Sequence, residues 1–592
     1  MVTLLSVLFL SSWWNKYLSP MSGGELTSVY LYRCGLLPYR DYFASAPPGT
    51  TLIALALSNL FGNHLIAYWA FGATLRVIGA VCAYLWLCRL VRPIWAVFAV
   101  ICAFVFSSVD IADTPYFYNH LASTFSLLAA FALTGTFERS WKHRAFFGLL
   151  SGLLLGSSLL IKQTTGVISF AMLIGSLCLL FGSKKAWGRL SVALVSFSVG
   201  ITIPVLGLLS WFYAKGILPA FIDQVFVRGP SSKGGALMSL LRPITMTIRY
   251  TDFSVPAFLC LVLVAISWIA YIQVKQNEMH TDSYWWLALP ALLFALLIGK
   301  NTSIPPLQLH TTFMSITYLA MVGCLSICFW AAANLLFGCW KKKNHTDLVM
   351  MAAVGFACAY ALSISWPAFE VMIFPGAALL FALVLEWGGP SRISPLVRSM
   401  IITSLLFLVT VSVVRKHNTP FYWGRWTEPP LITSTYEAKA PELTGFKLSP
   451  WTASFFDNVS ETIQTYSGPE DRIFVYPNMP ILYALANRLP ATFGLTHWVD
   501  VCPDFVADTD AQRLISSPPA VIVVHPDLPE ELANEEAIFR GGQHSGIRNI
   551  LIALKVIRPQ YQVVGLYQVP GHPVPIQVWA LTTTLMHKMQ QE

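Results

Sequence analysis

The residues best suited to chemistry lie in a polar stretch between two apolar segments near the start of the chain. Glu25 follows two glycines, and Asp41 belongs to an aromatic hexapeptide at residues 38–43. A carboxylate at the mouth of a membrane bundle can act as a general base, because it can take the proton of a hydroxyl. Glu25 could instead be an acid favoured at a helix start, and Asp41 could be the partner of Arg40. The two carboxylates are therefore rival candidates for catalysis.

Other polar groups follow at positions predicted to face the same side of the membrane. Asp110 and Asp113 could hold a cation or position a hydroxyl, although acids that cap a helix start are more common. Lys162 interrupts a long apolar run and could bind a phosphate, or it could extend to the membrane surface. The candidates for binding a donor phosphate are Arg40, Lys162, Arg242 and Arg249, and those for binding a substrate are Asp110, Asp113, Tyr118, Asn119, His120 and Gln163.

No sequence pattern for a nucleotide, a metal or a cofactor accompanies these groups. The chain contains neither a GxGxxG nor a GxxxxGK[ST] phosphate loop. Its 11 cysteines include no CxxC pair, so neither a zinc site nor a disulfide framework is expected. The sequence thus predicts no cofactor and no metal, and a divalent cation is not supported by any motif.

The elements that must position these groups are membrane-spanning helices. The 592 residues are 55% hydrophobic and 11% charged, with a mean hydropathy of +0.60, whereas globular chains carry about 25% charged residues. We therefore predict an all-α polytopic bundle of about thirteen spans, each able to cross roughly 30 Å of hydrocarbon. The predicted spans are 2–14, 64–88, 94–109, 115–137, 145–161, 166–182, 190–213, 253–274, 284–299, 309–338, 347–364, 367–387 and 397–414.

Charge distribution predicts the orientation of these spans. The formal charge is +9, but the basic residues collect in alternate short loops, which by the positive-inside rule lie in the cytoplasm. This pattern explains the positive charge without a nucleic-acid partner. The first outer loop at 15–63, the turn at 110–115, the loop at 214–251 and all residues after 414 then lie on the opposite side, so we expect a cytoplasmic N-terminus. Arg76 falls within a span, where an ionisable group is functional or pairs internally.

The tail of the chain has a different composition. Residues 1–414 are predicted to form the transmembrane domain, and residues 415–592 a small soluble α/β domain. Runs of β-branched and aromatic residues predict strands at 472–476, 520–524 and 561–566, and the segments 479–487 and 545–557 are predicted to be helical.

The polar residues together suit transfer of a group from a lipid-phosphate donor. Such a donor brings its own leaving group, so the protein needs cations for the phosphate and a carboxylate to deprotonate the acceptor. A transporter or flippase for polysaccharide or lipid would also place cations in a bundle. Such carriers usually show internal symmetry, which this sequence lacks. A third alternative is an inactive scaffold.

These motifs resemble, in order and spacing, those of the bacterial membrane-embedded class C glycosyltransferases, relatives of protein O-mannosyltransferases and of the lipid A aminoarabinose transferase. The resemblance extends over about residues 20–215 and is weaker from there to 414. The motifs that carry it are Gly23-Gly24-Glu25, Pro38-Tyr39-Arg40-Asp41-Tyr42-Phe43, Pro47-Pro48-Gly49, Tyr118-Asn119-His120 and Lys162-Gln163-Thr164-Thr165-Gly166.

The resemblance implies a polyprenyl-phosphate-linked sugar as donor and an acid of the first outer loop as catalytic base. It also implies an inverting hexosyl or pentosyl transfer to a lipid, glycan or protein acceptor. The placement would be the bacterial inner membrane, with a periplasmic C-terminal domain. The chain departs from the family in two ways. Only Glu25 stands where members often carry an Asp or an Asp-Glu pair, and Ala46 replaces a basic residue before the double proline, so Arg40 or Lys162 would have to contact the phosphate.

Overall fold

The computed structural model describes most of the chain, and it divides into two compact units. The described residues are 1–108, 114–137, 140–182, 185–233, 235, 237–241, 243, 320–321, 323–332, 345–365, 374–387, 395–423, 426–526, 529–570 and 572–582. The first unit comprises Met1–Ser12, Gly72–Gly207 and Leu241–Arg415. The second comprises Trp13–Phe71, Leu208–Leu240 and Lys416–Glu592.

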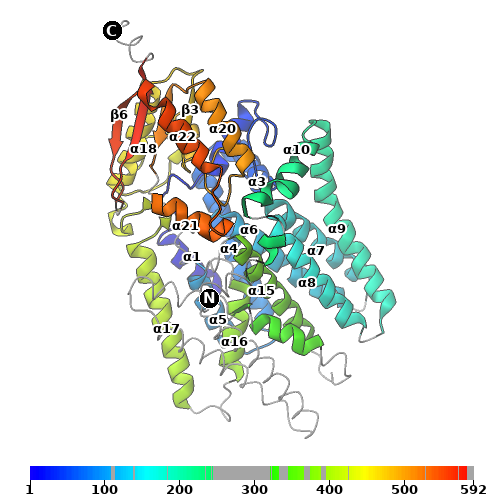
Figure 1. The fold of residues 1–592 in the computed structure, drawn as a ribbon. Coiled ribbons are helices and arrows are strands. Elements are labelled where there is room, and N and C mark those ends of the chain that lie inside the picture. Colours follow the sequence, from blue (N-terminus) through cyan, green and yellow to red (C-terminus); the bar gives the residue numbers. More distant parts are fainter. Residues whose placement is uncertain are drawn as a thin grey trace. The chain divides into compact units, whose positions relative to one another are not determined.

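The first unit is helical. Its core helix α6 packs against α7, α8 and α15, and α15 also packs against α16 (Figure 1). Helix α5 packs against α1 and α16. The bounds of these helices are α1 Val2–Ser11, α5 Pro93–Phe106, α6 Tyr118–Thr134, α7 Trp141–Ile161, α8 Gln163–Gly182, α15 His345–Ser365 and α16 Phe374–Trp387. Three further helices, α4 Leu65–Leu87, α9 Trp187–Ala214 and α17 Pro395–Asn418, run from one unit into the other.

Several of these helices are long and apolar enough to cross a membrane. Among the described residues there are 6, namely Leu65–Leu87, Tyr118–Phe137, Trp141–Ile161, Gln163–Gly182, Trp187–Ala214 and Thr346–Ile364. The predicted spans at 2–14, 94–109 and 367–387 correspond to the shorter apolar helices α1, α5 and α16. Those at 253–274 and 284–299 lie outside the described residues. The structure is thus that of a multi-pass membrane protein, while a total of about thirteen spans stays a prediction.

Close packing of α7 against α9 depends on a glycine from each helix at the contact. A Cβ atom on Gly152 would lie 2.1 Å from the carbonyl oxygen of Phe197, and one on Gly200 would lie 2.3 Å from the carbonyl oxygen of Leu149. Small residues at such positions let two backbones approach closely. In lipid, where no hydrophobic effect drives helices together, their association depends on such close packing.

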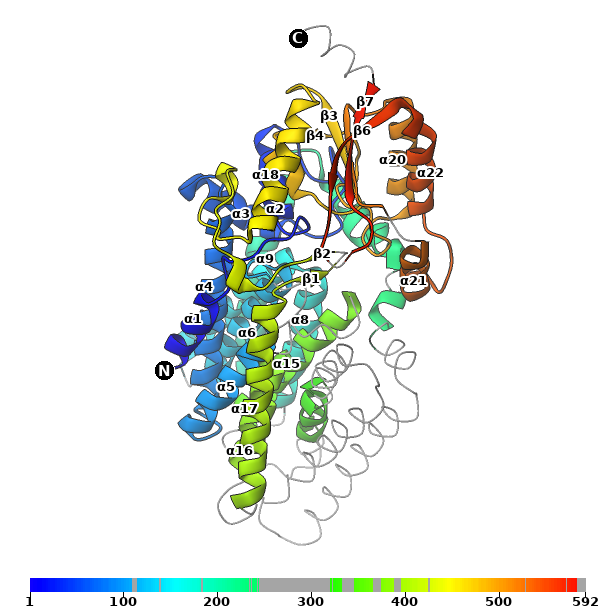
Figure 2. The same cartoon turned by 90° about the vertical axis from the view of Figure 1, so that its left-hand side faces the viewer.

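The second unit contains a five-stranded mixed sheet with strand order β4-β3-β5-β7-β6. Strand β3 is parallel to β4 and β5, whereas β7 is antiparallel to β5 and β6. Helix α18 lies on one side of the sheet, and α20 and α22 lie on the other (Figure 2). The bounds are β3 Arg472–Tyr476, β4 Leu489–Pro490, β5 Val521–Val524, β6 Tyr561–Tyr567, β7 Ile576–Leu581, α18 Pro450–Thr465, α19 Ile481–Leu485, α20 Asp504–Ser516, α21 Pro529–Arg540 and α22 Ile547–Ile557.

Part of this sheet was predicted from the sequence. The strand at 472–476 is confirmed without a shift, and those at 520–524 and 561–566 are confirmed within one residue. Helices α19 and α22 lie inside the two segments predicted to be helical. Strand β7 and helices α18, α20 and α21 were not predicted.

The sheet belongs to a unit larger than the predicted C-terminal domain. Helix α2 Gly24–Arg33 of the first loop packs against α3 Gly49–Phe61 and against α19. Helix α3 begins directly after Pro48, as expected of a double proline that cannot lie within a helix. The segment 208–240 adds α10 Leu218–Ile222, the π-helical turn η2 Asp223–Val227 and the turn η3 Gly229–Lys233. The second unit thus combines residues 416–592 with two earlier segments of the chain, and the assignment of residues 415–592 as a separate domain stays a prediction.

Candidate functional site

Glu25 occupies the first turn of α2 and is half-buried. In the described part of the chain, no other side chain forms a hydrogen bond or an ion pair with its carboxylate. Protein atoms nevertheless surround the group, and this desolvation raises the pKa of Glu25 to about 7, although the residue's own backbone N–H partly opposes the shift. A carboxylate with a pKa near neutrality can both accept and release a proton at physiological pH.

A polar network lies beside this helix. The Arg33 guanidinium, at the other end of α2, donates a hydrogen bond of 3.1 Å to the Ser58 carbonyl on α3. The buried Tyr68 hydroxyl donates to Asn63 at 2.7 Å. The first of these bonds ties α2 to α3, and the second holds Tyr68 against Asn63.

Asp41 lies in a different environment from Glu25. One of its oxygens accepts a hydrogen bond of 2.7 Å from the Leu37 N–H, and Arg40 forms an ion pair with the same oxygen at 2.8 Å. The hydrogen bond from Arg40 is the main cause that lowers the pKa of Asp41 below its usual value. The carboxylate therefore closes a turn and holds the half-exposed Arg40 side chain.

Gln224, which is not among the predicted site residues, fixes the loop around Asp41. Tyr39 is buried in a left-handed conformation with φ of 69°, and its hydroxyl donates to the Ala46 carbonyl at 2.8 Å. The Gln224 amide donates to the Tyr39 carbonyl at 2.6 Å and accepts from the Ala44 N–H at 3.2 Å. The only sequence signal for this role is a glutamine within an otherwise mostly apolar stretch.

Lys162 is buried in the helical unit, at the break between α7 and α8. Its side chain is 4% exposed, and its ammonium donates a hydrogen bond of 2.7 Å to Asn119. The same ammonium lies 5.4 Å from the centre of the Tyr118 ring, within the range of a cation–π interaction. The structure thus brings together Tyr118, Asn119 and Lys162, whereas Gln163 begins the next helix.

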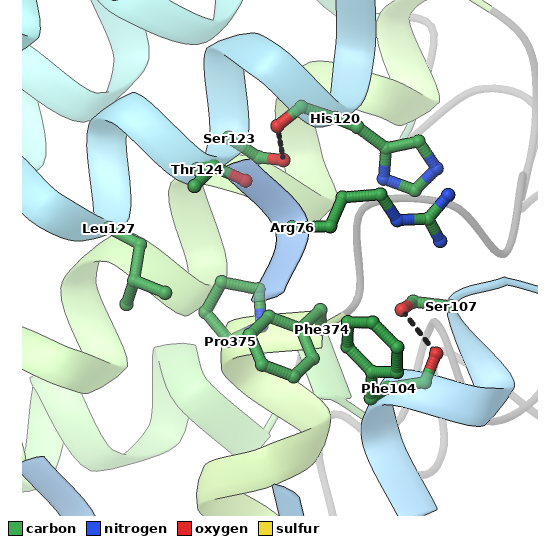
Figure 3. Close-up of a pocket in the computed structure, with 9 residues that line it drawn as sticks. All are labelled: Arg76, Phe104, Ser107, His120, Ser123, Thr124, Leu127, Phe374 and Pro375. Atoms are coloured by element: carbon green, nitrogen blue, oxygen red, sulfur yellow. Dashed lines mark hydrogen bonds between the residues drawn. The ribbon is translucent and has the colours of Figure 1, made fainter. Parts of the chain in front are cut away.

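A small pocket lies beside the start of α6. It is lined by Arg76, Phe104, Ser107, His120, Ser123 and Thr124, among others. Figure 3 shows the Arg76 guanidinium between the His120 ring and Ser107. Arg76 is 5% exposed and donates a hydrogen bond to Ser108. Arg76 therefore pairs internally, which is one of the two alternatives left open by the sequence.

The remaining candidates divide as follows. Asp110, Asp113, Arg242 and Arg249 lie outside the described residues. Glu25, Arg40 and Asp41 belong to the second unit, and Tyr118, Asn119, His120, Lys162 and Gln163 belong to the first. Within the described ranges, no group of three or more His, Cys, Asp or Glu side chains could hold a metal ion.

Comparisons with known proteins give little further information. The sequence matches no protein-family model and no curated protein. Among solved structures, the chain is similar to ArnT from Cupriavidus metallidurans bound to undecaprenyl phosphate, with a TM-score of 0.41, 12% identity and coverage of 98% of each chain. For the apo state of ArnT the TM-score is 0.40 and the identity 12%, with coverage of 98% of this chain and 96% of that one.

Proposed function

We propose that this chain is a membrane-embedded glycosyltransferase that moves a hexosyl or pentosyl group from a polyprenyl-phosphate donor to an acceptor hydroxyl. The transfer takes place on the periplasmic face of the bacterial inner membrane and inverts the anomeric centre. The motif resemblance supplies the reaction class. The observation that carries the proposal is Glu25, a carboxylate in the first turn of α2 without a counter-ion among the described residues and with a pKa raised to about 7.

The proposed step is a single displacement. The Glu25 carboxylate removes the proton of the acceptor hydroxyl while the hydroxyl oxygen attacks the anomeric carbon. The bond from that carbon to the phosphate oxygen breaks, and polyprenyl phosphate leaves with the bonding electron pair. Attack opposite the leaving group inverts the configuration. Because the donor carries an activated leaving group, the step calls for no cofactor.

Glu25 is a better base than Asp41 on physical grounds. A general base works best when its pKa lies near the working pH. Asp41 is already committed to the Leu37 N–H and to Arg40, both of which stabilise its ionised form and weaken it as a proton acceptor. We propose that Asp41 orients Arg40 and that Arg40 is one of the groups that contact the donor phosphate.

We propose Lys162, in the helical unit, as a separate candidate for binding the donor phosphate. Its ammonium is held by the Asn119 side chain and lies over the face of Tyr118. A cation that is already oriented loses little conformational entropy when an anion binds, and charge-assisted contacts to phosphate are among the stronger hydrogen bonds in proteins. Tyr118 and Asn119 would then act by holding Lys162.

Activity of two matched variants tests the proposal. Membranes that contain the wild-type chain, Glu25→Gln or Asp41→Asn are incubated with a panel of polyprenyl-phosphate-linked hexoses and pentoses, and the release of polyprenyl phosphate is measured. General-base assistance is typically worth about 10²- to 10⁴-fold in rate. Glu25→Gln should lose activity by that factor while donor binding is retained, and Asp41→Asn should be affected less.

The pH profile gives a second readout. The wild-type rate should rise with pH through about 7 and then level off, because only the ionised carboxylate accepts a proton. Mass spectrometry of envelope glycans from cells with and without the protein identifies the sugar and the acceptor. An active Glu25→Gln enzyme beside an inactive Asp41→Asn enzyme would show that Asp41 is the base, and no turnover with any donor would refute the reaction class.

A further inference from the structure

Helix α2, which carries Glu25, is attached to the C-terminal α/β part on both sides of that residue. Two positions after Glu25, the Thr27 hydroxyl donates a hydrogen bond of 2.6 Å to the Pro480 carbonyl, at the start of α19. Thr27 is fully buried. Pro480 immediately precedes α19, so its carbonyl belongs to the short segment against which α2 packs.

Two positions before Glu25, the backbone itself approaches α19. Gly23 caps α2 in a left-handed conformation with φ of 93°. A Cβ atom there would lie 2.9 Å from the Cδ1 atom of Ile481. Only glycine satisfies both conditions without strain, since side chains disfavour this conformation and the space is already filled. The carboxylate therefore projects from a turn that is fixed at each of its ends.

Helix α19 is in turn attached to strand β3 of the sheet. The Tyr483 hydroxyl accepts a hydrogen bond of 3.1 Å from the Val475 N–H of β3, and Tyr483 is fully buried. Just after the helix, Arg488 donates to the Ser467 hydroxyl at 2.9 Å. The position of this short helix is thus set by its contacts with the core of the α/β part.

We infer that the C-terminal α/β part takes part in the reaction by positioning the base, with Thr27, Gly23 and Ile481 as positioning residues. This inference rests on the proposed function. An error of about 1 Å in the placement of a reacting group can reduce a rate by about a hundredfold. A periplasmic α/β part that sets the position of α2 consequently controls catalysis without contacting the substrate.

The test compares two substitutions of Thr27, one that removes the hydroxyl and one that keeps it. Thr27→Val keeps the shape but leaves the buried Pro480 carbonyl without its donor, and Thr27→Ser keeps the donor. We expect Thr27→Val to lower kcat by about tenfold or more with an unchanged KM for the donor. Its pH–rate profile should shift away from the wild-type midpoint, because the surroundings of Glu25 change. Thr27→Ser should keep both the wild-type rate and the wild-type pH–rate profile.

A matched control separates positioning from loss of stability. Leu514 is fully buried on α20, so Leu514→Ala should lower the melting temperature without moving the pH–rate profile. Hydrogen exchange of the α2 amides should become faster in Thr27→Val and stay unchanged in Leu514→Ala, which gives a readout independent of turnover.

The outcomes are distinguishable from failure of the proposed function. Retained activity in Glu25→Gln would overturn the base and this inference with it. If Glu25→Gln is inactive but Thr27→Val keeps the wild-type rate and profile, the positioning role alone is overturned. An equal shift of the profile in Leu514→Ala would likewise overturn it, because general destabilisation would then explain the effect.

Discussion

Replacing Glu428 by glutamine should flatten the pH dependence of the protein's thermal stability. Glu428 is 1% exposed and follows the short strand β2 Trp426–Thr427. It accepts hydrogen bonds from the Trp426 indole at 2.9 Å and from the Thr452 hydroxyl at 2.7 Å. No cationic side chain pairs with it in the described part of the chain. Burial without a counter-ion raises the pKa of Glu428 to about 8, against an ordinary value of 4.5.

The sign of the effect follows from which state binds the proton more tightly. The folded protein keeps Glu428 protonated to a higher pH than the unfolded chain does. Its contribution to stability is therefore fully present below about pH 4.5, decreases as the pH rises, and is lost above about pH 8. The free energy of unfolding should fall by at most about 1.4 kcal/mol per pH unit across this window, and by an order of 5 kcal/mol in total.

Glutamine removes the titration while keeping the shape. Its carbonyl oxygen can accept from Trp426, and its amide can donate to the Thr452 hydroxyl, which then turns toward Ser449 at 2.8 Å. Thermal unfolding of the protein in detergent, followed by tryptophan fluorescence between about pH 5 and pH 8, should give a melting temperature that falls with pH for the wild type and falls less steeply for Glu428→Gln. The slope that remains in the variant belongs to Glu25, so above about pH 7 its melting temperature should change little.

The matched control is Glu437→Gln, because Glu437 is exposed in the same region of the chain. Its melting temperatures should run parallel to those of the wild type. A Glu428→Gln protein with the full wild-type slope would refute the reasoning, since another group would then be responsible for the pH dependence.

Two further predictions concern the helical unit. Lys162→Met should weaken use of a polyprenyl-phosphate donor about tenfold or more, because a charge-assisted contact is worth about 1.5–3 kcal/mol. Kinetics over a range of donor concentrations measures this effect, with Lys142→Met, at an exposed position on α7, as the control. An effect of Lys162→Met no larger than that of the control would contradict the assignment. Gly152→Leu should greatly reduce the yield of folded protein in size-exclusion chromatography, because even its Cβ atom would lie 2.1 Å from the Phe197 carbonyl oxygen. Gly175→Leu should be tolerated, since nothing lies within 4 Å of a Cβ atom there, and equal yields would disprove the packing argument.

Local patterns predicted the features that local physics determines. The β-branched run at 472–476 forms β3, the double proline sets the start of α3, and Lys162 marks the break between two helices. Each of these depends on a few neighbouring residues, so one sequence is sufficient.

Features that depend on distant segments could not be predicted in this way. Strand β7 is identified by its pairing with β5 and β6 more than by its own composition. The role of Gln224 requires a partner 185 residues away in the chain. Similarly, the sequence offers Arg40 as a possible partner of Asp41, but only the structure shows that Arg40 and the Leu37 N–H both contact this carboxylate.

The second unit is built from three separated segments of the chain, and this constrains how the protein is synthesised and folds. Helix α2 leaves the ribosome early, but its support α19 is synthesised only after Arg415, the last residue assigned to the helical unit. At about 5–20 residues per second, the first loop must wait on the order of tens of seconds for the segment that fixes it. During that interval the buried face of α2 has no partner from the C-terminal part. A chain released prematurely would carry every motif of the first loop and still lack an oriented carboxylate, so activity of the proposed kind would begin only once translation is nearly complete.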